Sequence, residues 1–331
     1  MSRGVRFGAP TRRDFLKLLG ATAVYPLVPR FPFAAPAGDQ RYEDAWAKLQ
    51  EDLTAEIERY TTRYARHAEV SISLVDLQTD QRLSIGGDVP RQPGCVINQF
   101  VLYSLVEDFQ RGLLEYDPLA RAIYLAIGES KAQVARNLLQ LTGGGSVEEG
   151  VARINARINE LGLKDTSLDH PPAFWGEYSV RGQPNAMTTD DAVEVMRHLY
   201  RNDMFDEEWS SFTIQRLTEG KRGLNIYIGL AVRDLPFARV AHKVGYFPDG
   251  YELRDMDGDA GLVLIDTPAG EIAYAMAILS EGNEPSPDND HPSFVYNGWF
   301  TWAVSKLAFD FFSEQYATGD PREARANRPS P

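Results

Sequence analysis

The chain has 331 residues, of which 43% are hydrophobic, and it carries a formal net charge of −13 with a single cysteine. One cysteine excludes an internal disulfide, so the fold must be stabilised by a buried core. A strongly acidic chain is repelled by nucleic-acid phosphates and by anionic membrane surfaces, and we expect neither as a partner. This length predicts one large domain or two interleaved lobes.

Residues 1–38 have the pattern of a twin-arginine export signal. Residues 11–20, TRRDFLKLLG, place paired arginines ahead of an apolar run, and the small residues at 35–37 offer a cleavage site. Pro26 and Pro29 interrupt the run before it could span a membrane, which disfavours the alternative of an N-terminal anchor. We therefore predict a periplasmic or extracellular protein without an integral membrane span. Residues 1–38 have a net charge of +5, so the remaining chain carries −18.

The first predicted elements are a helix and a hairpin. Residues 43–67 place apolar side chains on one helical face, with charged residues opposite. These apolar residues are Trp46, Leu49, Leu53, Ile57, Tyr60 and Tyr64. Residues 69–77 alternate as a half-buried strand, and 82–85 form its hairpin partner. A mainly helical stretch then runs from 96 to 217.

In the second half the chain returns to strands. Thr188 and Asp191 form a capping box for a helix whose buried stripe we expect to contain Ala192, Val195, Met196, Leu199 and Tyr200. Strands are predicted at 239–247, 260–267 and 272–279, and an aromatic-rich helix at 295–316. The polar, proline-containing residues 317–331 are predicted to be disordered.

This order predicts an α/β protein of the α+β type. Both ends of the chain would meet in a five-stranded antiparallel sheet with helices on both faces, and an all-helical lobe would be inserted between them. A cleft is expected where the sheet meets that lobe, and the chemistry is expected there.

Four segments of this chain resemble class A β-lactamases and the wider group of serine hydrolases and penicillin-binding proteins. They are residues 154–172, 185–200, 239–245 and 259–264, and they match the family in order and local spacing. The resemblance implies a single domain over 39–316, with an α/β lobe at 39–90 and 225–316 and a helical lobe at 91–224. It also implies a small-molecule or peptidoglycan-type ligand, with no cofactor and no metal. The oligomeric state stays open.

The resemblance implies three motifs around the cleft, and the first is changed at both key positions. In S-x-x-K, a serine attacks an acyl carbon and a lysine one turn later takes its proton. Here Cys95 stands at the serine position and Asn98 at the lysine position. An asparagine amide orients groups by hydrogen bonds but does not accept a proton near neutral pH.

The second motif, S-D-N, is changed as well. The alignment on residues 135–139 places Lys131, Ala132 and Gln133 at this motif, with Ser130 one residue early. A shift of one residue would restore the hydroxyl but would leave Lys131 and Ala132 in place of the aspartate and asparagine.

In the third motif, K-T-G, the chain has Lys243, Val244 and Gly245. The lysine keeps the positive charge for a substrate carboxylate, whereas Val244 supplies no hydroxyl. The resemblance places the oxyanion hole at the backbone N–H groups of Cys95 and Tyr246, and these donors survive side-chain changes.

A deacylating glutamate is the last family element, and Glu177 is its only candidate in the loop before Thr188. Its surroundings do not match the family's glutamate motif, and a solvated loop acid is the alternative.

Three functions are weighed for this site. Our leading hypothesis is an exported protein that has lost ordinary β-lactam hydrolysis and binds a cell-wall peptide or another carboxylate-bearing acyl compound. The alternative is an acyl hydrolase or transferase with Cys95 as nucleophile, its thiolate favoured by a helix N-terminus and by Lys243. An active β-lactamase is disfavoured, and whether the protein is an enzyme stays open.

Three further features are interpreted as structural. The segment RDMDGDAG, 254–261, is spaced like a calcium loop, but Ala260 replaces the required glycine, so we predict a surface turn that leads into a strand. Strand alternation points His242 away from the cleft. The aromatic residues of the last helix are predicted to pack on the sheet. They are Trp299, Phe300, Trp302, Phe309, Phe311 and Phe312.

Overall fold

The computed structural model describes residues 39–63, 65–173, 183–220, 227–247, 255–267, 270–283 and 292–316. The predicted export signal, Tyr64, Glu177 and the predicted disordered tail lie outside these residues. None of the helices in the described ranges combines the length and the apolar character that crossing a bilayer demands.

The strands form one antiparallel sheet in the order β2-β1-β5-β4-β3. Its strands are β1 (Glu69–Asp76), β2 (Arg82–Ile85), β3 (Ala238–Phe247), β4 (Asp255–Thr267) and β5 (Gly270–Asn283). Strands from the two ends of the chain pair directly, because β1 lies beside β5 with Ile72 opposite Ile278. The predicted sheet is thereby confirmed.

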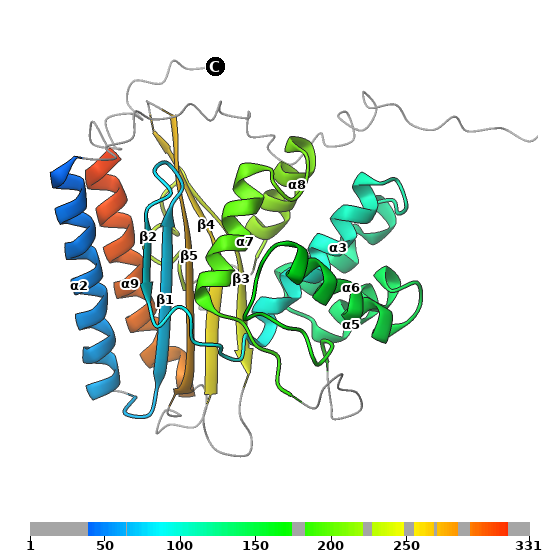
Figure 1. The fold of residues 1–331 in the computed structure, drawn as a ribbon, viewed down its shortest axis with the longest axis horizontal. Coiled ribbons are helices and arrows are strands. Elements are labelled where there is room, and N and C mark those ends of the chain that lie inside the picture. Colours follow the sequence, from blue (N-terminus) through cyan, green and yellow to red (C-terminus); the bar gives the residue numbers. More distant parts are fainter. Residues whose placement is uncertain are drawn as a thin grey trace, which may run out of the picture.

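Helices cover both faces of the sheet (Figure 1). On one face lie α2 (Gln40–Arg63) and α9 (Pro292–Tyr316), side by side. The other face carries the helical lobe. Its elements are η1 (Gly94–Asn98), α3 (Gln99–Gln110), η2 (Asp117–Leu119), α4 (Ala120–Ile123), η3 (Tyr124–Gly128), α5 (Ala132–Thr142), α6 (Val147–Glu160), α7 (Thr189–Arg201) and α8 (Glu207–Thr218).

The sheet therefore separates two hydrophobic cores. One lies between the sheet and the helical lobe, and the other between the sheet and the pair α2 and α9. The predicted alternation in β1 was wrong, because Ser71 and Ser73 are as buried as Ile72 and Leu74. A central strand covered by helices on both faces has no solvent side.

Helix patterns were predicted more accurately. Thr188 Oγ1 accepts a hydrogen bond from the backbone N–H of Asp191, and the whole predicted stripe of α7 is buried. In α9 the prediction fails for two residues, because Trp299 and Trp302 are 69% and 43% exposed whereas Phe300 is buried against Tyr60. A helix this apolar has more aromatic side chains than its packed face can hold.

A tight seam joins η1 to β3 and positions the start of α3 on the sheet. A Cβ atom added to Gly245 would stand 2.4 Å from the carbonyl oxygen of Pro93, so β3 and the chain ahead of η1 touch through their backbones. Gly94, with φ at +49°, has its own contact, since its Cβ would stand 3.2 Å from the backbone nitrogen of Tyr246 and 2.8 Å from the sulfur of Met256. Only glycine gives this approach without strain.

We predict that Gly94→Ala destabilises the protein by about 1–2 kcal/mol more than Gly112→Ala. Both residues have positive φ, at +49° and +68°, so both substitutions strain the backbone, but nothing lies within 4 Å of a Cβ at Gly112. The difference between the two losses of stability therefore measures the effect of the contacts that Gly94 makes in the seam. Urea denaturation of the two variants measures it, and equal losses of stability would show that η1 and β3 can separate freely.

Candidate active site

Cys95 lies at the start of η1, one short turn before α3 begins at Gln99. Its side chain is partly exposed and is not disulfide-bonded. Asn98, which stands where the family motif has its lysine, is buried at the junction of η1 and α3. The structure therefore places a thiol near the start of η1 and a neutral amide, rather than a base, at its end.

Lys243 is the charged group of the site. It projects from β3 with only 1% of its surface exposed, and its ammonium donates hydrogen bonds to Ser130 Oγ and, over 2.7 Å, to the carbonyl oxygen of Val244. Burial lowers the pKa of Lys243, while the nearby charges of Cys95 and Asp259 raise it.

Ser130 reaches Lys243 through an unusual backbone. The preceding η3 is a single π-helical turn, and Ser130 itself has φ at +52°, a conformation that is uncommon for a residue other than glycine. Such departures from regular geometry gather at functional sites, because the surrounding structure must hold them in place. Here the strained turn positions a hydroxyl against the buried ammonium.

The contact with Lys243 distinguishes Ser130 from the other predicted residues of the second motif. Ser130 is the residue of the second motif that meets Lys243, whereas Lys131 and Gln133 have exposed side chains. Gln133 donates instead to Asn137 along the surface of α5, over 3.1 Å. Lys131 N-caps α5 in an extended conformation, which turns the chain away after Ser130.

The remaining predicted site residues lie on β3, at the seam. Gly245 contacts the chain ahead of η1, and the backbone nitrogen of Tyr246 faces Gly94, the residue before Cys95. Two backbone segments that were predicted to supply the oxyanion donors, Cys95 and Tyr246, thus lie next to each other in space. Val244 is partly buried and takes part through its carbonyl oxygen.

His242 on β3 and Asp259 on β4 form a buried pair that the sequence analysis did not predict. His242 Nδ1 bonds to both carboxylate oxygens of Asp259 over 2.8 Å, and both side chains are buried. The predicted surface turn at 254–261 was wrong, since β4 begins at Asp255 and Asp257 is buried as well. The alternation of Asp257 and Asp259 was a strand signal, hidden by a composition that is typical of turns.

Chemically, the site offers hydrogen-bond donors around one thiol. Within the described ranges, no group of three or more His, Cys, Asp or Glu side chains is arranged to hold a metal ion. The arrangement can hold an acceptor such as a carboxylate or a carbonyl against Ser130, Lys243 and the backbone of the seam.

The fold agrees with that of known proteins. A family model described as the β-lactamase enzyme family matches residues 118–293. The TLA-1 extended-spectrum β-lactamase is 14% identical with a TM-score of 0.63, and the alignment covers 79% of this chain and 98% of that one. A β-lactamase from Sphaerobacter thermophilus DSM 20745 is 17% identical with a TM-score of 0.62, covering 80% of this chain and 97% of that one.

PBP-A is also similar, at 17% identity and a TM-score of 0.60, covering 80% of this chain and 96% of the other. No curated protein matches this sequence. At identities this low, the structural similarity shows a shared fold alone. The low identities agree with the divergence seen in the three motifs. Because the family model matches more than half of the chain, this protein belongs to the β-lactamase enzyme family.

Proposed function

We propose that this protein is an exported, non-hydrolytic member of the family that binds a cell-wall peptide or another carboxylate-bearing acyl compound. Export by the twin-arginine pathway to the periplasm or the cell exterior rests on the leader pattern of residues 1–38. The observation that carries the binding role is the contact of the buried Lys243 ammonium with Ser130 Oγ, together with a buried amide, Asn98, at the position of the family's lysine. These residues supply donors but no strong base.

Hydrolysis by the usual route requires a group that removes the proton of the nucleophile. Asn98 stands in place of the lysine that does this in the family, and an amide is not protonated near neutral pH. Lys243 does not replace it as an ammonium, because its protons are already directed to Ser130 and to the carbonyl of Val244. The first step of ordinary β-lactam turnover therefore lacks its base.

Ligand binding needs none of these missing groups. Since Ser130 Oγ accepts a hydrogen bond from Lys243, its own proton is free to point toward a ligand acceptor, with the ammonium charge directly behind it. A carboxylate fits this donor better than a neutral group does. One variant of PBP-A, a protein of similar fold, was solved as an acyl-enzyme complex with penicillin G. That complex supports an acyl compound as the ligand of this protein.

We predict that the purified protein binds penicillin G or a D-alanyl-D-alanine peptide without turnover. Ser130→Ala and Lys243→Met should each weaken binding by about tenfold or more, since a hydrogen bond to a charged group contributes roughly 1.5–3 kcal/mol. Gln133→Ala serves as the matched control, because this exposed side chain donates to Asn137 along the surface of α5. Isothermal titration calorimetry measures affinity, and nitrocefin absorbance measures turnover.

Sustained hydrolysis of nitrocefin that disappears in Cys95→Ala would contradict the non-hydrolytic role. Equal affinity in the wild type, Ser130→Ala and Lys243→Met would show that the ligand does not use this site.

A thiol enzyme is the second candidate, and the partial exposure of Cys95 beside the charge of Lys243 favours it. A thiolate needs no base at the moment of attack. The sulfur would form a thioester with the acyl carbon of an ester or thioester, the leaving alcohol or thiol would take up a proton, and water would then hydrolyse the thioester. Asn98 and the donors of the seam would orient the acyl group.

Intact-mass spectrometry tests this candidate with a panel of β-lactams, activated esters and thioesters. If the proposed binding role is correct, no panel compound adds mass, although iodoacetamide still alkylates Cys95. An acyl adduct that forms in the wild type and is absent from Cys95→Ala would establish the thiol enzyme instead. The rate at which that adduct is lost would then separate a hydrolase from a trapped acyl-enzyme.

A further inference from the structure

Residues 91–95, which lead the chain into η1, cross the sheet on their way to the seam. In chain order they meet β1, β5 and β3, and these strands follow one another in the same order across the sheet, with β4 between the last two. The contacts are Arg91 with Ser71, Gln92 with Glu281, and Gly94 with Tyr246. We call residues 91–95 the entry segment, because they bring Cys95 to the seam.

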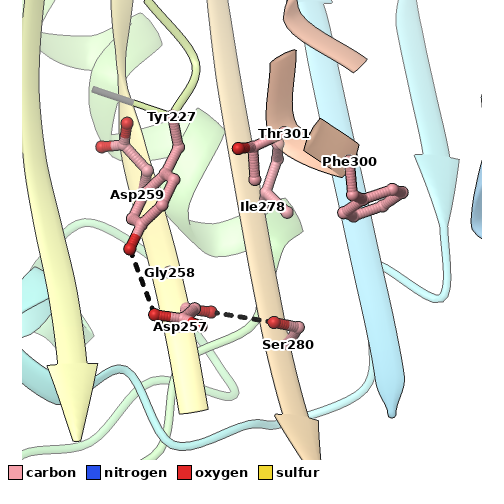
Figure 2. Close-up of a pocket in the computed structure, with 8 residues that line it drawn as sticks. All are labelled: Tyr227, Asp257, Gly258, Asp259, Ile278, Ser280, Phe300 and Thr301. Atoms are coloured by element: carbon pink, nitrogen blue, oxygen red, sulfur yellow. Dashed lines mark hydrogen bonds between the residues drawn. The ribbon is translucent and has the colours of Figure 1, made fainter. Parts of the chain in front are cut away.

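The entry segment lies on the face of the sheet that carries the helical lobe. Leu279 of β5 packs in the core beneath that lobe, and Glu281, two residues later on the same strand, points to the same face. Ser280 points the other way and lines the cavity shown in Figure 2. That cavity has a volume of about 10 Å³, enough for no more than one water molecule, so it is no ligand site. The contacts of Glu281 therefore belong to the side of the sheet on which the candidate site lies.

Arg91 is the anchor at the start of the entry segment. Only 6% of its surface is exposed, and its Nε donates to Ser71 Oγ over 2.7 Å and its Nη1 to Glu69 Oε2 over 3.0 Å. The backbone N–H and carbonyl of Arg91 both pair with Met187, over 2.9 Å each. A planar guanidinium that bonds to two acceptors is fixed in direction as well as in place. The side chain is thus tied to β1, and it is too buried to serve as a partner for a ligand.

Glu281 holds the next residue of the entry segment. One of its carboxylate oxygens accepts a hydrogen bond from the backbone N–H of Gln92 over 2.5 Å, and the other lies 3.8 Å from Nη1 of Arg91. A hydrogen bond to a carboxylate is stronger than one to a neutral acceptor. The side chain of Glu281 is 33% exposed, so solvent weakens its attraction for Arg91. Its bond to the backbone of Gln92 is therefore its main contribution.

The entry segment has no slack between Arg91 and the seam. The Cα atoms of Arg91 and Gly94 lie at most about 11 Å apart even if the chain is fully extended, and the ring of Pro93 fixes its own φ. Gly94 is held at the seam, where its Cβ would stand 3.2 Å from the backbone nitrogen of Tyr246. Both ends of the segment are thus fixed, one on β1 and β5 and the other on β3. The position of Cys95 depends on both ends.

We propose that Arg91, together with Glu281, is a positioning residue of the candidate site and fixes the chain that presents Cys95. Neither side chain touches a ligand, and both act through the thiol of Cys95 and its backbone N–H at the seam. Loss of Arg91 would release the start of the entry segment while Gly94 still holds its end. The effect on the segment does not involve a ligand, whereas the effect on ligand affinity rests on the proposed function.

The test compares Arg91→Met and Glu281→Ala with a matched control, Arg153→Met. Arg153 is also a partly buried arginine, and its two terminal nitrogens donate to Asp108 over 2.8 Å each, which joins α6 to α3 away from the entry segment. The control therefore removes a comparable ion pair without touching the proposed anchor. Urea denaturation gives the global stability of each variant.

Two measurements report on the entry segment without a ligand. Hydrogen–deuterium exchange followed by mass spectrometry measures how often the backbone of residues 91–96 opens. Alkylation by iodoacetamide, followed by intact mass, measures the accessibility of Cys95, which is the single cysteine of the chain. Local opening and global unfolding are separate processes, so a change confined to residues 91–96 distinguishes positioning from a general loss of stability.

In Arg91→Met, we expect residues 91–96 to exchange about tenfold faster than in the wild type, since hydrogen bonds to a charged group are lost from the folded state. Alkylation of Cys95 should speed up by about threefold or more, because its partly buried thiol becomes more exposed. Glu281→Ala should act in the same direction. The double variant should change less than the sum of the two single effects, because both residues hold one segment. Arg153→Met should leave residues 91–96 and Cys95 as in the wild type.

The affinity for penicillin G, measured by calorimetry, separates this proposal from the proposed function. If the wild type binds penicillin G, Arg91→Met should bind it about threefold or more weakly, since the groups of the site are less well held. A wild type that does not bind would count against the proposed function. Exchange and alkylation would still decide the role of Arg91.

Wild-type exchange and alkylation in a folded Arg91→Met protein would overturn the proposal. An equal change at residues 91–96 in Arg153→Met would also overturn it. If Arg91→Met does not fold, Glu281→Ala decides, because this partly exposed side chain can be removed without opening the core. Unchanged exchange at residues 91–96 in Glu281→Ala would then contradict the positioning role.

Discussion

The buried ammonium of Lys243 is the constraint on which the candidate site depends. A charge removed from water requires hydrogen-bond acceptors in fixed positions, and these come from different parts of the chain. One acceptor, Ser130 Oγ, comes from a strained turn of the helical lobe, and the other, the carbonyl oxygen of Val244, belongs to β3 itself. The lysine thereby ties the lobe to the sheet, and it explains why a backbone conformation as uncommon as that of Ser130 is tolerated.

The seam between η1 and β3 imposes the second constraint. With Gly245 against Pro93 and Gly94 against Tyr246, the backbones leave no room for side chains between them. The groups that the seam can offer to a ligand are therefore backbone N–H groups and the thiol of Cys95, which follows Gly94. Backbone donors persist when side chains change, so such a site can lose catalytic residues and still bind an acyl group.

The fold was predictable because both ends of the chain carry clear strand patterns. The order of strands and the helical insertion follow from those patterns, and so does the capping of α7 by Thr188. Burial on both faces of β1 was not predictable from alternation, since it depends on which helices cover the sheet. Trp299 was misplaced for a related reason, because periodicity alone does not tell which aromatic residues of an apolar helix remain outside.

The site was harder to predict because its key contacts depend on loop geometry. Motif spacing predicted Cys95, Asn98 and Lys243 as site residues, and the structure adds the contact of Lys243 with Ser130, which follows a π-helical turn. A sequence pattern carries no signal for such a turn. Asp259 was missed for a different reason, since glycine and aspartate at 254–261 are typical of loops and here build a buried strand.

The polar groups predicted to surround Cys95 are mainly hydrogen-bond donors, which suits ligand binding better than proton abstraction. Ser130 and Lys243 present protons, and the backbone of the seam adds further N–H donors. Asn98 has an amide that both donates and accepts but does not take a proton. The buried carboxylate of Asp259 lies on the other face of the sheet, where it bonds to His242. Under the proposed function, this set of donors suits an anionic ligand, and it would act on a substrate only if the thiol of Cys95 supplied the reactive group.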